Sequence, residues 1–393
     1  MKTRRRVACL ALTLGMIGAS AQLHLITGSA GPKSPNGYVS ALFHVTSAGS
    51  VKKVEDLVTE PIGTDWITAS QNLRSAVLAP RSLDQDLVVV DFDKASAVKR
   101  CKEPEAGMAV IDHWIWDTPD HGPVYAEYLA YGNRGQLRAM LLDPSVPCNE
   151  SFLPIGPQDA KYLVASGSAG VAESGGYDYM RALIRKDGSL SCFFPWGVGE
   201  TYFDERMPVA LFADFAHPIP FVMASNAHLF VVGIIDDGLP ARGHRLLVFR
   251  KGDKTWLRMP DVGESTSYER AFGTYIAAVA VARKEATKEV SAGRSEWRTG
   301  DSKTGPSMLA RFHDSPFVFP GRLYLFDAST ERTHTIITNQ GDSEILLVEN
   351  GAVYYRASDR LYRADLTDKG LSPGRLLATS EVIRDAHWAF IKH

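Results

Sequence analysis

The chain has 393 residues, of which 43 are basic and 45 acidic, and 45% of them are apolar. An apolar share of this size can build a large buried core and excludes an intrinsically disordered chain. The slight acidic excess makes the chain a poor candidate for general nucleic-acid binding, which needs a basic surface.

The first 21 residues have the pattern of an export signal. Lys2 and Arg4–Arg6 give a basic start, an apolar stretch runs from Val7 to Ala19, and Ala19-Ser20-Ala21 precedes Gln22. The apolar stretch is shorter than the roughly 20 residues of a membrane-spanning helix, and small residues stand where a signal peptidase requires them. We therefore expect residues 1–21 to be removed and the mature protein, 22–393, to be secreted or periplasmic.

Cleavage would change the charge and the cysteine count of the protein. Four of the 43 basic residues would be lost, which leaves 39 basic against 45 acidic residues and a net charge of −6. Cys101, Cys148 and Cys192 remain, and in an oxidising compartment two of them can form a disulfide while the third stays a thiol. The sequence leaves the pairing open. The cysteine spacing fits no zinc site, and we expect neither a metal site nor a transmembrane segment.

Short apolar runs separated by turn residues dominate the mature chain. Examples are Leu87–Val90, Val124–Tyr131, Leu229–Val232, Leu246–Phe249 and Leu323–Phe326. Runs of four to eight residues rich in β-branched and aromatic side chains favour strands over helices. Hairpin signals such as Asp236-Asp237-Gly238 and Glu349-Asn350-Gly351 lie between them. The sequence predicts an all-β protein.

An acidic residue recurs directly before such a strand. The repeated positions are Asp65, Asp112, Asp159, Asp214, Glu269, Asp342 and Asp385, at spacings of 47, 47, 55, 55, 73 and 43 residues. Four strands with their turns take about 40–50 residues, the length of one blade of a β-propeller. Seven starts predict a single seven-bladed β-propeller, with six or eight blades or a β-sandwich as the alternatives.

The last start leaves room for only one strand before His393. In a closed ring this strand would share a blade with strands from the N-terminus, for which 23–27, 38–45 and 51–58 are suitable. Closure of this kind removes the exposed sheet edges of an open array.

One segment, 283–307, interrupts the repeat. It is polar, charged and rich in Gly, Ser and Thr, and it contains Trp297. We expect a long inserted loop in the sixth blade, which is either a tolerated insertion or a place where binding residues have been added.

The clearest repeat runs from Asp342 through Ala352-Val353-Tyr354-Tyr355-Arg356 and Leu361-Tyr362-Arg363-Ala364-Asp365 to Leu376-Leu377-Ala378. It resembles the blades of secreted bacterial TolB-like and YncE-like propellers. The resemblance implies the propeller architecture for most of the mature chain. The resemblance assigns no functional residue to this chain, because only the spacing of the strands within the blade matches.

Candidate binding residues lie at the strand starts, which would gather at one mouth of the central channel. They are Asp112 and His113, Asp214 and His217, and Asp385 and His387, to which Trp297 of the inserted loop is added. Carboxylate and imidazole groups together can bind a ligand or act as an acid–base pair. The recurrence of the acid favours a structural explanation, because Asp at the entrance to a strand accepts backbone N–H bonds.

Local motifs of common enzyme classes are missing: the sequence has no GxSxG, HExxH, P-loop or dinucleotide glycine pattern. We interpret the chain as a non-enzymatic exported propeller that binds a small molecule, a saccharide or a protein partner. The alternatives are a propeller hydrolase or lyase that acts on a saccharide or peptide through channel Asp and His groups, and a structural scaffold of the envelope. The sequence identifies no cofactor.

Overall fold

The computed structural model describes a large part of residues 22–393. The residues described are 22–28, 39–58, 65–71, 73–80, 86–102, 109–118, 122–131, 134–154, 181–184, 189–193, 203–211, 213, 218–226, 228–236, 245–260, 266–280, 282–283, 317–318 and 321–393. They are nearly all β. Helical turns described among them include α1 (Cys148–Ser151), η1 (Val209–Leu211) and η4 (Glu381–Asp385). No helix in this part of the chain is long and apolar enough to cross a bilayer. The expected signal peptide lies outside the described residues.

The strands of the first half of the chain lie in antiparallel sheets of four strands each, one of which also contains the last strand. One has the order β3 (Val51–Val58), β2 (Ser40–Val45), β1 (Gln22–Thr27) and β30 (Ala386–Lys392). The next has β4 (Asp65–Ser70), β5 (Ser75–Pro80), β6 (Asp86–Asp91) and β7 (Ser96–Lys102). A third has β8 (Ala109–Thr118), β9 (Gly122–Tyr131), β10 (Arg134–Leu141) and β11 (Phe152–Pro154).

The second half continues the pattern with one difference. A seven-stranded sheet has the order β14 (Phe203–Arg206), β13 (Ser189–Phe193), β12 (Arg181–Ile184), β15 (Pro218–Ser225), β16 (Leu229–Asp236), β17 (Arg245–Arg250) and β18 (Thr255–Arg258). The sequence predicted two separate blades here. A single register pair, Arg181 with Phe221, joins them, and the inner strand expected after Asp159 lies outside the described residues.

Two further sheets of four or more strands are described in the rest of the chain. One contains β19 (Thr266–Phe272), β20 (Tyr275–Ala280), β23 (Arg322–Asp327) and β24 (Arg332–Ile337). The other contains β25 (Ser343–Glu349), β26 (Ala352–Ala357) and β27 (Arg360–Thr367), with β28 (Gly370–Leu371) and β29 (Arg375–Thr379) both paired to β27.

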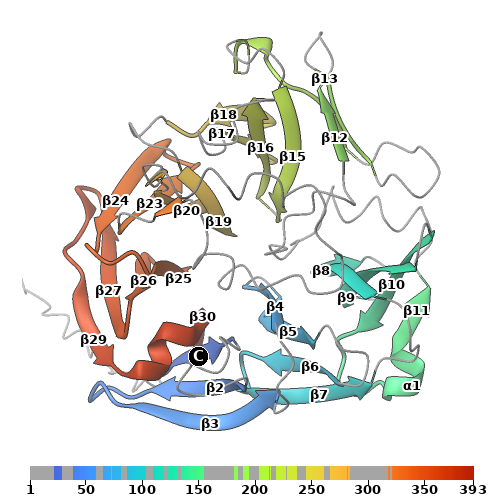
Figure 1. Cartoon of the computed structure of the whole chain (residues 1–393), viewed down its shortest axis with the longest axis vertical. Coiled ribbons are helices and arrows are strands. Elements are labelled where there is room, and N and C mark those ends of the chain that lie inside the picture. The colour runs from blue at the N-terminus through green and yellow to red at the C-terminus, as the bar shows by residue number, and fades with distance from the viewer. Residues whose placement is uncertain are drawn as a thin grey trace, which may run out of the picture.

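The sheets stand around a common centre, as Figure 1 shows. Strands β4, β8, β19, β25 and β30 lie toward the centre, and β3, β7, β11, β24 and β29 lie on the outside. Successive four-stranded antiparallel sheets in radial order define a β-propeller. We call the side on which the innermost strands begin the strand-start face.

The first and last strands of the described chain belong to one sheet. Strand β30 pairs antiparallel with β1, from Gln22 opposite Lys392 to Thr27 opposite Ala386. The sequence assigned the strand after Asp385 to the same sheet as the N-terminal strands, and β3-β2-β1-β30 is the order found.

Apolar clusters lie between neighbouring sheets. In one of them Val231 and Val248 of the seven-stranded sheet pack with Ile276 and Phe326 of the β19–β24 sheet. A sheet that is covered on both faces has continuous apolar runs in its inner strands rather than alternating patterns. Strand β26 is buried along its whole length.

A disulfide joins two sheets on the outside of the molecule. Cys101 of β7 is bonded to Cys148 of α1, with a Cα–Cα distance of 5.3 Å. Beside it the ammonium of Lys99 donates to the carbonyl oxygens of Leu141 (2.8 Å) and Asp143 (2.9 Å) and to the hydroxyl of Ser151 (2.7 Å). The structure therefore selects one of the three pairings that the sequence left open.

Candidate functional site

Charged side chains from neighbouring sheets meet where β25 and β30 begin. Arg270 comes from β19, Glu344 from β25, Arg356 from β26 and His387 from β30, and Asp342 directly precedes β25. We call these five residues the arginine–carboxylate cluster.

Local backbone irregularities accompany these side chains. The β1–β30 register skips His387, so this residue is the extra residue of a bulge. The β19–β20 register skips Glu269, the residue before Arg270, and the β25–β26 register skips Leu346. A bulge bends its strand and redirects nearby side chains, as is common beside functional sites.

Glu344 is at the middle of the cluster. Its Oε1 accepts a hydrogen bond from Arg270 Nη2, and its Oε2 accepts one from Arg356 Nη2 at 2.9 Å. His387 Nδ1 lies 3.6 Å from the same Oε2. The second terminal nitrogen of Arg356 donates to Asp342 Oδ1. Each oxygen of the Glu344 carboxylate therefore accepts a hydrogen bond from a different arginine.

Burial and charge together fix the protonation of the cluster. The side chains of Arg270 and Arg356 are only 4% and 3% exposed. Burial alone would raise the pKa of Glu344, but Arg270, the hydrogen bond from His387 and Arg356 outweigh it and hold this pKa well below its usual range. Burial would likewise lower the pKa of Arg356, yet Glu344 and Asp342 raise it. Glu344 stays ionised near neutral pH and has no proton to donate.

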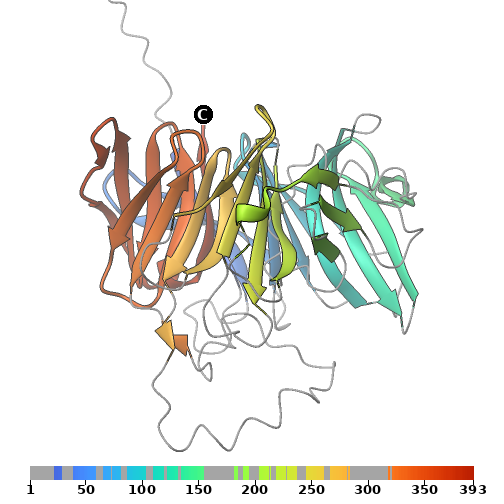
Figure 2. The same cartoon turned by 90° about the horizontal axis from the view of Figure 1, so that it is seen from above.

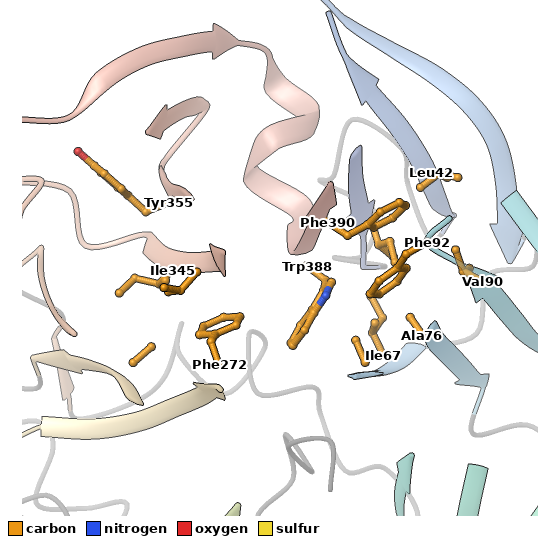
Figure 3. Packing of buried hydrophobic residues seen from close by; sticks show 14 of the residues in the cluster. Leu42, Ile67, Ala76, Val90, Phe92, Phe272, Ile345, Tyr355, Trp388 and Phe390 are labelled. Atoms are coloured by element: carbon orange, nitrogen blue, oxygen red, sulfur yellow. The ribbon is translucent and has the colours of Figure 1, made fainter. Parts of the chain in front are cut away.

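An apolar layer adjoins the cluster. The Arg270 guanidinium lies 4.9 Å from the centre of the Trp388 ring, and Trp388 lies 5.6 Å from the ring of Phe272. Figure 3 shows Trp388 between Phe272 on one side and Ile67 on the other. Aromatic and aliphatic side chains thus fill the space beside the cluster.

Of the six strand-start candidates, the structure places Asp385 and His387 in or beside the cluster. Asp385 is 4% exposed, and its carbonyl accepts from Gly28 N at 2.8 Å. His387 packs on the backbone of Gly28 so closely that a Cβ there would lie 2.3 Å from its Cδ2. These contacts agree with a packing role for both residues.

The other candidates are not brought to the cluster by anything the structure describes. Asp112 and His113 lie in β8, next to a register skip at Ile111, and their side chains are outside the described part. Asp214, His217 and Trp297 lie outside the described residues altogether.

Sequence reasoning missed Arg270, Glu344 and Arg356. Two of the cluster residues carried a usable signal: Glu344 and His387 each stand two positions after a repeated acid, Asp342 and Asp385. A polar residue at that position of an otherwise apolar strand marks a side chain that needs a buried partner.

The described ends of the inserted segment lie on the side where β30 begins. Strand β20 runs antiparallel to β19, and β21 (Ala282–Arg283) follows it directly and pairs with β22 (Phe317–Val318). Figure 2 shows this small orange sheet on one side of the body and the C-terminal end of β30 on the other. Residues 284–316 lie outside the described part.

Among the described residues, no group of three or more His, Cys, Asp or Glu side chains is arranged to hold a metal ion. The arginine–carboxylate cluster is a network of ion pairs beside the apolar layer of Trp388 and Phe272. It lies on the strand-start face of a β-propeller.

No protein-family model matches the chain, and no curated protein matches it. Similar solved structures include a puromycin hydrolase mutant complexed with PGG (11% identity, TM-score 0.44, 91% of this chain and 52% of that chain). Others are apo AztD from Citrobacter koseri (7%, 0.42, 94% and 98%) and TolB from Acinetobacter baumannii (10%, 0.34, 91% and 65%). At these identities and TM-scores, the similarities assign neither a family nor an activity to the chain.

Proposed function

We propose that the protein is an exported, seven-bladed β-propeller whose ring is closed by β1 and β30, and that it binds a partner on the strand-start face without chemical turnover. The antiparallel pairing of β30 with β1 supports the closure. The disulfide between Cys101 and Cys148 supports export, because such bonds persist in oxidising compartments.

The observation that carries the binding proposal is the state of Glu344. Acid–base catalysis needs a carboxyl whose pKa lies near the working pH. Two arginines instead hold the pKa of Glu344 low, and each of its oxygens accepts a hydrogen bond from one of them. The cluster therefore works as a rigid support in this proposal. The inserted segment, whose described ends β21 and β22 lie on the same side, is proposed to make the contact, since binding residues are commonly carried by loops on a rigid scaffold.

A small molecule, a saccharide or a protein fits this arrangement better than a nucleic acid, because the mature chain is acidic. Trp297 is the residue of the inserted segment best suited to stack on a sugar or to anchor a peptide. We assign it that contact role within the proposal.

A thermal-shift panel of oligosaccharides, peptides and divalent cations tests the proposal on protein recovered from the periplasm of a bacterial host. We expect a first residue of Gln22 and at least one compound that raises the Tm of the wild type, but not that of Trp297→Ala, because a ligand stabilises only the form that binds it. The compound should be recovered chemically unchanged.

Three results would contradict the parts of this proposal separately. A chain that begins at Met1 and stays in the cytoplasm contradicts export. A Tm shift that survives in Trp297→Ala contradicts the contact role of the inserted segment. Conversion of the compound by the wild type favours the hydrolase or lyase alternative.

A further inference from the structure

Strand β30 receives hydrogen bonds from arginine side chains of three different sheets. Arg356 Nε donates to the carbonyl of Ala386 at 2.9 Å, and Arg270 Nη1 donates to the carbonyl of His387. At the other end of the strand, Arg74 Nη2 donates to the carbonyl of Ile391 at 2.5 Å. Arg356 belongs to β26, Arg270 to β19, and Arg74 to the turn between β4 and β5.

Each of these arginines is itself held by a carboxylate. Glu344 binds both Arg270 and Arg356, while Asp93 and Glu349 lie 3.0 Å and 3.5 Å from Arg74. The guanidinium group suits this double task, because its planar fork can bind a carboxylate with one edge and a carbonyl with another. A lysine in the same place would offer one point charge instead.

Further contacts surround the end of β30. Lys392 Nζ donates to the carbonyl of Lys94 at 3.1 Å, and His393 Nε2 lies 3.3 Å from Glu349 Oε1. The turn that carries Arg74 also reaches β25, where Gln71 Nε2 donates to the carbonyl of Val348 at 3.1 Å. Both ends of the strand are thus tied to sheets other than its own.

We propose that Arg74, Arg270 and Arg356 form an arginine clasp that fastens the C-terminal strand, and that β30 opens from β1 as one unit when the clasp is weakened. The register of β1 and β30 is continuous from Gln22 opposite Lys392 to Ile26 opposite Trp388. Loss of the clasp therefore frees a whole strand rather than one end. The device is a property of the fold and does not depend on the ligand.

Hydrogen–deuterium exchange of the full mature protein tests the clasp with Arg74→Gln. Arg250→Gln is the matched control: its side chain is 23% exposed against 22% for Arg74, it pairs with Asp253 and Glu331, and it donates to the carbonyl of Ala328, but it does not touch β30. Exchange in β9, which pairs with neither β30 nor the strand β17 that carries Arg250, serves as the reference for global opening.

We expect Arg74→Gln to speed exchange in 386–392 and 22–27 by about tenfold relative to β9, because a hydrogen bond from a charged group is lost. Arg250→Gln should leave both segments within about twofold of the wild type. Faster exchange confined to the turn around Arg74, or equal acceleration in both variants, would overturn the proposal. Arg270→Lys gives a second test, in which the charge is kept and the fork is lost.

Discussion

Glu344 is the residue on which the interpretation of the strand-start face depends. Its carboxylate is shared by Arg270 and Arg356, and a histidine stands beside it. A carboxylate and a histidine at this distance would suit proton transfer if the carboxylate were free. Because both of its oxygens are bound by arginines, the same pair forms part of the framework.

His24 offers a direct test of how burial acts on a single residue. It lies in β1, is 4% exposed, and stacks between the rings of His44 (5.1 Å) and Phe390 (5.2 Å). Burial lowers its pKa from 6.5 to about 4; the charges of His44 and Lys392 add to this, and the carbonyl of Gln22 opposes it. The folded protein therefore holds His24 neutral at pH values where the unfolded chain protonates it.

The consequence is a loss of stability in mild acid. Between pH 6.5 and about 4 the unfolded chain binds more protons at this residue than the folded protein does, so the free energy of unfolding falls as the pH falls through this window. From pH 7.5 to pH 5 the wild type should lose about 2 kcal/mol that His24→Phe does not lose. Urea unfolding at the two pH values measures the difference.

His44→Phe is the control for this experiment, since it changes the neighbouring ring of the stack and leaves His24 in place. It should keep most of the acid sensitivity of the wild type, because burial, the largest cause of the lowered pKa of His24, remains while only the smaller contribution of His44 is lost. Equal losses in the wild type and in His24→Phe would show that His24 does not cause the effect. The lowered pKa of Glu344 reduces the free energy of unfolding only once the pH falls into the ordinary carboxyl range. This loss is the same in the wild type, His24→Phe and His44→Phe.

At the scale of the element, most strands could be predicted because their residues carry local signals. The expected run Leu323–Phe326 lies within β23, and Glu349-Asn350-Gly351 forms the turn before β26. Asn350 and Gly351 both have positive φ, as the hairpin chemistry requires. The bulges at Glu269 and His387 were not predicted, because a register skip depends on the partner strand and leaves no pattern in its own sequence.

One repeated turn signal was overlooked. After the third strand of several sheets, a carboxylate accepts backbone N–H groups two or three residues later: Asp91 binds the amides of Asp93 and Lys94, and Asp327 binds that of Ser329. Aspartate suits such turns because its side chain mimics a backbone acceptor. This second repeat supports the same blade rhythm as the acids before the first strands.

The disulfide is the element-scale feature whose removal has the clearest expected result. Cys101 and Cys148 are 47 residues apart, and a link across a loop of this length stabilises by about 2–4 kcal/mol. Replacing both by serine should lower the free energy of unfolding by that amount, as measured by urea unfolding. The unfolded mature wild type should show one free thiol, that of Cys192.

Cys192→Ser is the matched control and should leave no free thiol while the disulfide remains. Three thiols in the unreduced wild type would contradict the bond. A disulfide that includes Cys192 would contradict the pairing.

At the scale of the whole molecule, the sequence predicted the all-β propeller class and the place of the last strand, because both follow from spacing. Spacings of 43–55 residues, apart from the one of 73 that contains the inserted segment, and a final strand without a blade of its own point to a shared terminal sheet. The cluster could not be predicted in the same way. Arg270 and Glu344 are 74 residues apart, and only the radial arrangement of the sheets brings them together.

The position of His387 and the contacts of the arginine clasp both depend on the sheet that the two terminal strands, β1 and β30, share. A cross-strand disulfide tests it most directly, with Leu25→Cys and Ala389→Cys in a Cys192→Ser background. These two positions are opposite each other in the β1–β30 register, and opposite residues in antiparallel strands lie within the Cα–Cα range that a disulfide spans. Leu25→Cys with Ala277→Cys of β20 is the control pair.

Mass spectrometry of unreduced peptides gives the answer. We predict that the peptides containing positions 25 and 389 are linked in most molecules and that the control pair is not linked. Free thiols at both positions after mild oxidation, or equal linkage in the control pair, would contradict the pairing of β1 with β30, on which the arginine clasp depends.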